Sequence, residues 1–368
     1  MTEAMLKHLF LPLDVGKLAL PHRIAMPPMT RYRCGADGTA LDIQATYYAQ
    51  RASAALIVCE SVYTDPTGRI GYRAGGMINA HQQASWAKVA KAVHDEGGRI
   101  FIQLLHGGRF SHPSLQPGGE PTVSASSAMP PPDTVQIEGG TAVPTLPRAL
   151  ERFEIDRIIK SYARTAALAA EAGFDGVELH GANGYLPSQF LSSNTNLRTD
   201  EYGGSIANRA KFMLETLEEL AAVRGPEHVG VKISPNFSHH GERDASPKET
   251  FTYLAKALDK LGLAYVHIQC AADFMRPVPD TFDPIDLIRP VYRGKLLASG
   301  QFDRHSAEKA IASGRCDFIA FGRRFIANPD LPERFRRGAA ENAINMETLI
   351  TEGAPGMTDY PFLEPQVQ

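Results

Sequence analysis

The feature that most constrains the fold is a short apolar run that recurs eight times along the chain. Each run is rich in Val, Ile and Leu and is nearly continuously apolar, which is typical of parallel β-strands buried on both faces. The eight predicted strands comprise residues 22–28, 55–61, 99–106, 176–181, 229–235, 264–269, 295–300 and 317–323.

Helical patterns lie between these runs, and the clearest covers residues 154–173. There Ile155, Ile158, Ile159, Tyr162 and Ala166 mark one face at helical spacing. Four glycines stand just before predicted strands, where a helix C-terminus favours a left-handed residue. They are Gly173, Gly262, Gly294 and Gly314.

Eight strand–helix units in about 300 residues match an α/β fold of the (β/α)8 TIM-barrel type, whose usual size is about 250 residues plus insertions. A doubly wound open sheet is the alternative. The main insertion, Gly107–Leu150, follows the third strand, and its Pro, Gly and Ser content disfavours a helix. We expect loops and a hairpin over the barrel mouth, within a single domain spanning residues 1–368.

The composition favours a soluble globular protein with a small-molecule partner. Hydrophobic residues make up 43% of the 368 residues and charged residues 21%. The formal net charge of −3 provides no basic field for nucleic acid or an anionic membrane. No apolar run approaches the roughly 20 residues of a membrane span, and residues 1–14 lack the apolar core of a signal peptide, so we expect a cytoplasmic protein.

The four cysteines fall at irregular spacings, which indicates neither a zinc site nor a redox dithiol. Cys59, Cys270 and Cys316 lie in apolar stretches and are predicted to be buried. The sequence gives no prediction of whether Cys34 is buried.

Polar side chains stand at the predicted strand ends, and the chemistry of such barrels takes place at the C-terminal ends of the strands. Thr30 follows the first strand, and the last two strands end in the sequences SGQ and FGRR. The other strand-end residues are Gln103 and His106 on the third strand, His180, Asn183 and Tyr185 on the fourth, and Lys232 and Ser234 on the fifth.

Several chemistries are open to the sequence VELHGANGYLPSQF, which holds His180, Asn183 and Tyr185. A metal site needs further ligands, for which Glu178 is a candidate only if the strand is regular, and no nucleophilic triad signature is present. Neutral His and Asn side chains together offer two N–H donors to an oxygen that gains negative charge, although a purely structural pair is the alternative. Tyr185 is a poor base near neutral pH but can protonate a carbanion or enolate, unless it is only a rim aromatic.

Lys232 can act as a fixed positive charge beside an anionic group or as a Schiff-base nucleophile. The ends of the seventh and eighth strands are where barrels frequently bind phosphate through backbone N–H groups. Arg323 or Arg324 would add positive charge there, whereas each glycine taken alone could be a simple turn.

In these strand-end residues and in the sequence around them, the chain resembles the old yellow enzyme family of FMN-dependent ene-reductases. The resemblance runs from LPHRIAMPPMTRYR to TDYP, and its most specific parts are HGANGYLPSQFLSSNTNLRTDEYGGSIANR and FGRRFIANPDL. It implies non-covalent FMN, NADPH or NADH as the hydride donor, and a monomer or homodimer.

The resemblance also implies roles for individual residues. Thr30 would hydrogen-bond the flavin O4 region, Gln103 would pair with its pyrimidine edge, and Lys232 would stand beside N1 and O2. The remaining implied cofactor contacts are Pro28, Gly300, Gln301, Gly322 and Arg323. The implied substrate contacts are Tyr72, Leu105, Ile350, His180 and Asn183, with Tyr185 as the proton donor.

The implied reaction is a ping-pong cycle. A nicotinamide cofactor, with NADPH favoured, reduces FMN and leaves, and an α,β-unsaturated carbonyl or nitro compound takes its place. Hydride then passes from flavin N5 to the β-carbon while His180 and Asn183 hold the activating oxygen, and Tyr185 protonates the α-carbon.

The sequence departs from the usual family pattern at three positions. Lys232 replaces an arginine, which keeps the charge but loses the planar fork. Leu105 replaces a tryptophan, which predicts a wider pocket, and Ile350 stands where some relatives place a tyrosine. Thr30, in place of a cysteine, favours the larger, longer-looped branch of the family.

Two alternatives remain open from the sequence. One is a Schiff-base aldolase or lyase that uses Lys232. The other is an FMN-binding barrel that catalyses isomerisation or dealkylation, or no reduction at all.

Overall fold

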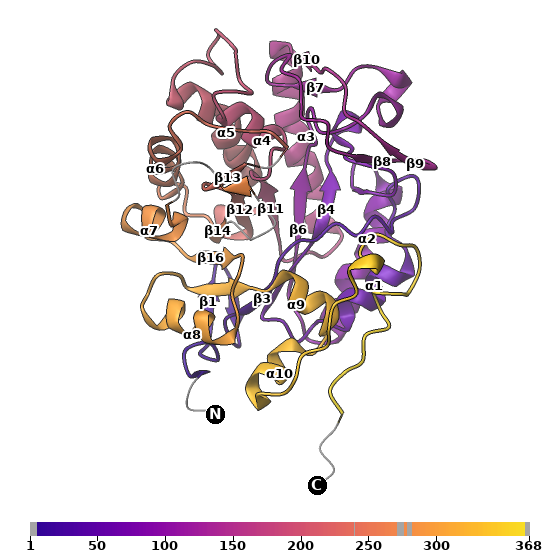
Figure 1. Ribbon diagram of the computed structural model, residues 1–368, viewed down its shortest axis with the longest axis vertical. Coiled ribbons are helices and arrows are strands. Elements are labelled where there is room, and N and C mark those ends of the chain that lie inside the picture. Colours follow the sequence, from indigo (N-terminus) through magenta and orange to yellow (C-terminus); the bar gives the residue numbers. More distant parts are fainter. Residues whose placement is uncertain (1–5, 239, 271–275, 278–281, 365–368) are drawn as a thin grey trace.

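Eight parallel strands close into a barrel in the computed structural model, which describes residues 6–238, 240–270, 276–277 and 282–364 (Figure 1). Strand β17 pairs with β3, and β3 pairs in parallel with β4, so the sheet has no open edge at that point. This closure confirms the predicted TIM barrel and rules out the open sheet. In chain order the barrel strands are β3 (Ile24–Met26), β4 (Leu56–Tyr63), β6 (Ile100–Leu105), β11 (Gly176–His180), β12 (Val229–Ile233), β14 (Tyr265–Gln269), β16 (Leu296–Ser299) and β17 (Phe318–Ala320).

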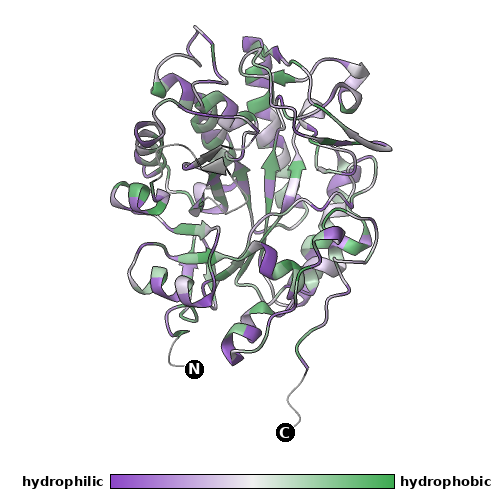
Figure 2. Ribbon diagram, viewed as in Figure 1, coloured by the Kyte–Doolittle hydropathy of each residue, from purple (hydrophilic) through white to green (hydrophobic). Residues whose placement is uncertain are grey.

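Helices surround the barrel, and Figure 2 shows mostly hydrophobic strands at the centre and helices that mix hydrophobic and hydrophilic residues around them. The predicted apolar face of α3 is confirmed, because all five of its marker residues are buried. The described helices are α1 (Asp42–Ala49), α2 (Ala80–Asp95), α3 (Arg152–Glu171), α4 (Leu186–Leu191), α5 (Ile206–Arg224), α6 (Pro247–Leu258), α7 (Pro284–Ile288), α8 (Arg304–Ala312), α9 (Gly322–Ala327) and α10 (Leu331–Arg337). No helix in the described part of the chain is long and apolar enough to cross a membrane.

Three of the four predicted helix-ending glycines are left-handed, with φ of +90° at Gly173, +68° at Gly262 and +73° at Gly314. The prediction for Gly294 is wrong, because its φ is not positive. Helix α7 continues into a 3₁₀ turn at Arg289–Val291, and Tyr292 is already extended. The chain has therefore left the helix before it reaches Gly294.

The amino end of the barrel is closed by an apolar plug. A hairpin of β1 (Leu13–Val15) and β2 (Leu18–Leu20) packs its buried side chains against the lower barrel interior. The inward-facing partners there include Ala25, Leu56, Val58, Phe101, Tyr265, Leu297, Phe318 and Ala320. Because this end is filled with apolar side chains, polar chemistry is confined to the carboxyl ends of the strands.

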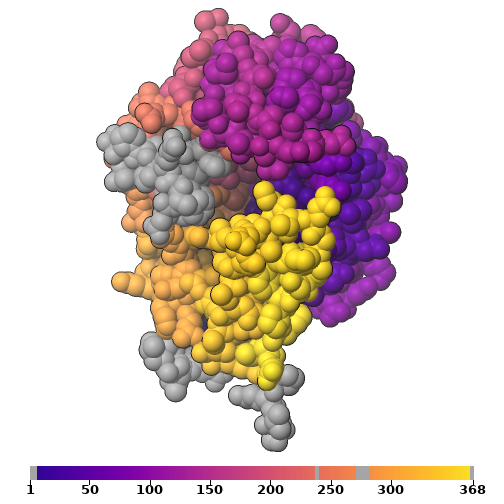
Figure 3. Space-filling model, turned by 45° about the vertical axis from the view of Figure 1, so that its right-hand side comes forward, coloured from indigo at the N-terminus to yellow at the C-terminus, as the bar shows by residue number. Residues whose placement is uncertain are grey.

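The insertion Gly107–Leu150 follows β6 and lies on the side of the barrel toward which the arrowheads of β4 and β6 point (Figure 1). It contains a hairpin of β8 (Val135–Ile137) and β9 (Gly140–Ala142), a short pair of β7 (Val123–Ser124) and β10 (Arg148–Ala149), and two 3₁₀ turns, with no α-helix in residues 107–150, all of which are described. Figure 3 shows the surface hollowed between this magenta segment and the yellow C-terminal segment.

The cysteine predictions hold for Cys59 and Cys316, which are buried, and the open case, Cys34, is fully buried. The prediction for Cys270 is wrong, because it is only half-buried. Cys270 directly follows β14 at the barrel mouth, where the chain leaves the packed wall. Among the described residues no group of three or more His, Cys, Asp or Glu is placed to hold a metal ion.

Candidate active site

The strand register brings the predicted polar residues to one end of the barrel. Strand β11 pairs with β6 so that Glu178 lies opposite Gln103, and with β12 so that His180 lies opposite Lys232. Strand β12 in turn places Lys232 opposite His267 of β14. Since paired residues of parallel neighbours share a face, these five side chains form one polar layer above the apolar plug.

His180 is buried at the end of β11, and its ring is positioned by the turn that follows. Its Nδ1 accepts a hydrogen bond from the Ala182 N–H at 3.4 Å. In the neutral ring an accepting Nδ1 leaves the proton on Nε2, so His180 offers an N–H donor. The ring packs edge-on against Tyr185, with 4.8 Å between centroids.

Asn183 occupies a left-handed backbone position, with φ of +60°, which asparagine tolerates better than most residues. Its backbone N–H donates to Ser234 Oγ at 3.0 Å, and its side-chain Nδ2 donates to Gln269 Oε1 at 3.3 Å. The amide carries a second Nδ2 hydrogen, and its buried Oδ1 has no protein partner. Asn183 can therefore bind a ligand through its second Nδ2 hydrogen or its Oδ1 while it keeps its hydrogen bond to Gln269.

Tyr185 is the N-cap residue of helix α4 and packs between His180 and Phe110, with 6.1 Å between its ring centroid and that of Phe110. Burial raises the pKa of its phenol well above the usual value, and nearby Tyr32 adds to the shift. Tyr185 therefore stays protonated across the physiological range and can serve as an acid but not as a base. It also packs on the apolar cluster that contains Leu105.

Lys232 is 5% exposed, so the prediction that it is not a solvated lysine is confirmed. Burial lowers the pKa of its ammonium to about 8, and the Glu178 carboxylate acts in the opposite direction. Gln103 is likewise buried, and its Nε2 donates to Glu178 Oε1 at 2.8 Å. A cation and an amide thus stand on the two strands that flank β11, β12 and β6.

Thr30 lies beyond β3, two residues after Pro28, and its Oγ1 is 3.0 Å from Ser61 Oγ. Ser61 pairs with Gln103 across β4 and β6. This contact brings the hydroxyl of Thr30 to the same end of the barrel as the amide of Gln103.

The ends of β16 and β17 lie side by side because the two strands pair directly. Gly300 has φ of +143°, and a Cβ there would come within 3.1 Å of the Cys270 carbonyl oxygen, so only glycine fits. Gln301 follows it, and Gly322 begins α9 on the neighbouring strand end.

Of the two arginines after Gly322, Arg324 is engaged by Glu341 and by the Phe302 carbonyl, 3.3 Å from its Nε. Arg323 is exposed. The sequence resemblance implies Arg323 as the contact to an anionic group at these strand ends, and its exposed side chain directly follows Gly322 in α9.

The three remaining implied substrate contacts, besides His180 and Asn183, differ in their surroundings. Leu105 is buried beside Tyr185, and Tyr72 packs on the Phe110 cluster while its hydroxyl donates to Glu138 Oε1 at 3.3 Å. Ile350 is 52% exposed, on a C-terminal segment whose neighbouring Leu349 carbonyl accepts hydrogen bonds from two arginines near β3. Those arginines are Arg31 and Arg33.

Sequence reasoning missed two groups at this end of the barrel. His267 and Ser299 join the polar layer through hydrogen bonds. In the sequence, each could have been recognised as a polar residue inside an otherwise apolar run. Phe110 and His240 stack with 3.3 Å between ring centroids and pack against Tyr185, a contact between distant loops that no local pattern indicates.

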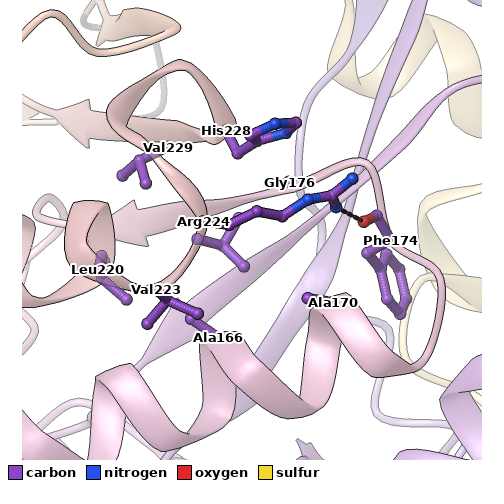
Figure 4. Close-up of a pocket in the computed structure, with 10 residues that line it drawn as sticks. Ala166, Ala170, Phe174, Gly176, Leu220, Val223, Arg224, His228 and Val229 are labelled. Atoms are coloured by element: carbon purple, nitrogen blue, oxygen red, sulfur yellow. Dashed lines mark hydrogen bonds between the residues drawn. The ribbon is translucent and has the colours of Figure 1, made fainter. Parts of the chain in front are cut away.

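A separate hollow between α3 and α5 is not part of this site. It is lined by Ala166, Phe174, Leu220 and Val229, and lies near the amino ends of β11 and β12 (Figure 4). Its volume of about 20 Å³ is room for a single water molecule. It is too small for an organic ligand.

The donor set at the mouth fits the FMN that the sequence resemblance implies. The amide of Gln103, the ammonium of Lys232 and the hydroxyl of Thr30 suit the polar edge of a flavin ring. The glycine-bearing ends of β16 and β17, with exposed Arg323, suit its phosphate.

Comparisons with known proteins give the same result. The family model described as "NADH:flavin oxidoreductase / NADH oxidase family" matches residues 8–342. The chain is 36% identical over 367 residues to "Putative 12-oxophytodienoate reductase 11" of Oryza sativa subsp. japonica, covering 98% of both. It is 35% identical over 362 residues to 12-oxophytodienoate reductase 2 of Arabidopsis thaliana, covering 97% of this chain and 96% of the relative.

Two solved structures are similar over almost the whole chain. Morphinone reductase in complex with tetrahydroNAD shares 42% identity at a TM-score of 0.92, covering 98% of this chain and 99% of that one. The old yellow enzyme homologue from Zymomonas mobilis shares 36% identity at a TM-score of 0.93, covering 96% and 99%.

Proposed function

Because the chain belongs to the NADH:flavin oxidoreductase / NADH oxidase family, the family of old yellow enzyme, with FMN as cofactor and a nicotinamide as hydride donor, we propose that it is an ene-reductase. Its substrates would be α,β-unsaturated carbonyl or nitro compounds, reduced at the activated C=C bond in a ping-pong cycle. NADPH is the proposed donor. The relatives named as 12-oxophytodienoate and morphinone reductases support reduction of a small organic substrate.

The observation that carries this proposal is the arrangement of His180, Asn183 and Tyr185. The first two supply N–H donors from one turn after β11, and the third packs 4.8 Å from the His180 ring. Two donors aimed at one carbonyl or nitro oxygen stabilise the negative charge that develops there as the β-carbon accepts hydride. A protonated phenol beside them can then deliver a proton to the α-carbon.

Bound FMN supplies the hydride chemistry, and the protein supplies binding and electrostatics. Thr30 and Gln103 would orient the flavin ring, and Lys232 would place a positive charge beside it. Gly300, Gln301, Gly322 and Arg323 would hold the phosphate, with Pro28 beside the ring. Tyr72, Leu105 and Ile350 would contact the substrate.

The test starts with the absorption spectrum of the purified protein, which should show bound flavin. NADPH oxidation should then depend on 2-cyclohexenone. Flavin binding without enone-dependent NADPH consumption, over a panel of enones and nitroalkenes, would contradict the reductase proposal and favour an isomerising, dealkylating or inactive barrel.

Tyr185→Phe separates the two half-reactions. Reduction of the flavin by NADPH should stay nearly unchanged, whereas reoxidation by an enone should slow by about 10²-fold or more, as expected for loss of a general acid. Stopped-flow absorbance measures both rates. An equal loss in both half-reactions would exclude Tyr185 as the acid.

A Schiff-base lyase is the second candidate, because burial lowers the pKa of Lys232 to about 8 and so makes a neutral amine accessible. Borohydride trapping of a carbonyl compound on Lys232, followed by peptide mass analysis, would support it. No trapping in protein that carries FMN would exclude it.

A further inference from the structure

A hydrogen-bonded chain crosses the barrel directly beneath the proposed flavin site. Gln103 Nε2 donates to Glu178 Oε1 at 2.8 Å, His267 Nδ1 lies 2.9 Å from Glu178 Oε2, and His267 Nε2 lies 2.8 Å from Ser299 Oγ. Glu178 and His267 are completely buried. The mechanism above uses neither of them.

The direction of the hydrogen bonds in this chain follows from the chemistry of its members. Burial lowers the pKa of the His267 imidazole, while Glu178 acts against that shift, so the ring is neutral near pH 7. Nδ1–H then donates to Glu178, and Nε2 accepts from the Ser299 hydroxyl. Both oxygens of the Glu178 carboxylate are thereby engaged, one by Gln103 and one by His267.

This arrangement fixes the orientation of the Gln103 amide. A carboxylate only accepts, so the NH2 group of Gln103 must face Glu178, and its carbonyl oxygen faces the other way. A flavin presents one ring N–H donor, N3–H, between its two carbonyl oxygens. The locked amide therefore offers an acceptor that matches this single donor.

The Glu178 carboxylate also affects the protonation of Lys232, which lies on the neighbouring strand β12. The charged or titratable groups that face Lys232 are Glu178 and His180 from β11 and His267 from β14. Of these, Glu178 is the carboxylate, and its charge supports the protonated form of Lys232 against burial.

We propose that Glu178, braced by His267 and Ser299, is a positioning residue for the flavin: it orients the Gln103 amide toward N3–H and keeps Lys232 protonated beside the ring. The proposal rests on FMN binding and not on the reductase activity, so it can fail while enone reduction stands, and the reverse.

The test measures FMN affinity and the midpoint potential of bound FMN between pH 6 and pH 10. A plot of potential against pH breaks at the pKa of any group that takes up a proton on reduction. In the wild type we expect a break near pH 8, the pKa of Lys232. Glu178→Gln should move the break down by about one pH unit or more and weaken FMN binding about tenfold, since a neutral amide neither locks Gln103 nor opposes burial of the ammonium.

Glu178→Asp separates the two roles. It keeps the charge but shortens the side chain, so the break should stay near pH 8 while FMN binding weakens. This variant also decides the question if Glu178→Gln does not fold, as judged by circular dichroism. Unchanged FMN affinity in Glu178→Asp would then overturn the positioning role.

Glu60→Gln is the matched control, because Glu60 is also a fully buried carboxylate, but it contacts Tyr48 of α1 and the Arg31 backbone instead of the barrel interior. It should leave the break near pH 8. If Glu178→Gln shifts neither the break nor the FMN dissociation constant more than Glu60→Gln does, the proposal is wrong.

Discussion

Arg51 tests how the proposed phosphate end of the site is held in place. This fully buried guanidinium lies 3.8 Å from the Tyr47 ring centroid. It donates to the carbonyls of Phe325 at 2.7 Å, Ile326 at 2.7 Å and Met357 at 3.2 Å. Two of these carbonyls belong to the last turn of α9, the helix that begins at Gly322, and the third belongs to the C-terminal segment.

Arg51→Met keeps the length and apolar stem of the side chain but removes every donor. These three carbonyls, and the Tyr47 carbonyl that accepts from Arg51 at 2.9 Å, then lose this donor. An unsatisfied buried polar group costs about 1–3 kcal/mol. Allowing for relaxation and water entry, we expect the free energy of unfolding to fall by about 3–5 kcal/mol, which is in the range of a broken buried network. With an unfolding entropy of about 2.1 cal/mol/K per residue, this corresponds to a melting temperature lower by about 4–6 °C.

Calorimetry of the apo- and holoprotein measures this change, and fluorescence titration should show weaker FMN binding because α9 shifts. Arg293→Met is the matched control, since Arg293 is 87% exposed and pairs with Asp259 at the surface. Its effect should stay within about 1 kcal/mol. A melting temperature for Arg51→Met within 1 °C of the Arg293→Met value would refute the reasoning.

Three further predictions concern the backbone, the cation and pH. Gly300→Ala should lower FMN affinity and the melting temperature together, because a Cβ would meet Cys270 at 3.0 Å and φ is +143°; unchanged FMN titration would contradict the proposed phosphate site. Lys232→Arg should retain FMN, shown by an unchanged flavin content after gel filtration, because the charge is kept; a colourless variant would mean that the position has been misread. Burial lowers the pKa of His22 to about 4, and its Nδ1 accepts from the Ile24 N–H at 3.2 Å. As pH falls from 6.5 toward 4 the unfolded chain binds this proton first, so the free energy of unfolding should drop by up to about 3 kcal/mol from this group. His22→Gln should flatten that part of the urea-denaturation pH profile, and an unchanged slope would exclude His22 as its source.

The sequence alone was sufficient for the barrel, because parallel strands buried on both faces require long apolar runs, and eight such runs leave few topologies. It also placed His180, Asn183, Tyr185 and Lys232 at strand ends, since strand direction is fixed once the barrel is assumed. The role of Gly294 was misjudged because a 3₁₀ turn, which local composition does not encode, ended the helix early.

Only the tertiary structure decided which side chains meet across strands. The sequence shows Glu178, His267 and Ser299 as isolated polar residues in three apolar runs, 121 residues apart from first to last. Strand register brings them into one hydrogen-bonded chain with Gln103, because paired residues of adjacent parallel strands share a face. Local patterns therefore determined the elements and the residues at their ends, whereas the long-range register determined the contacts among those residues.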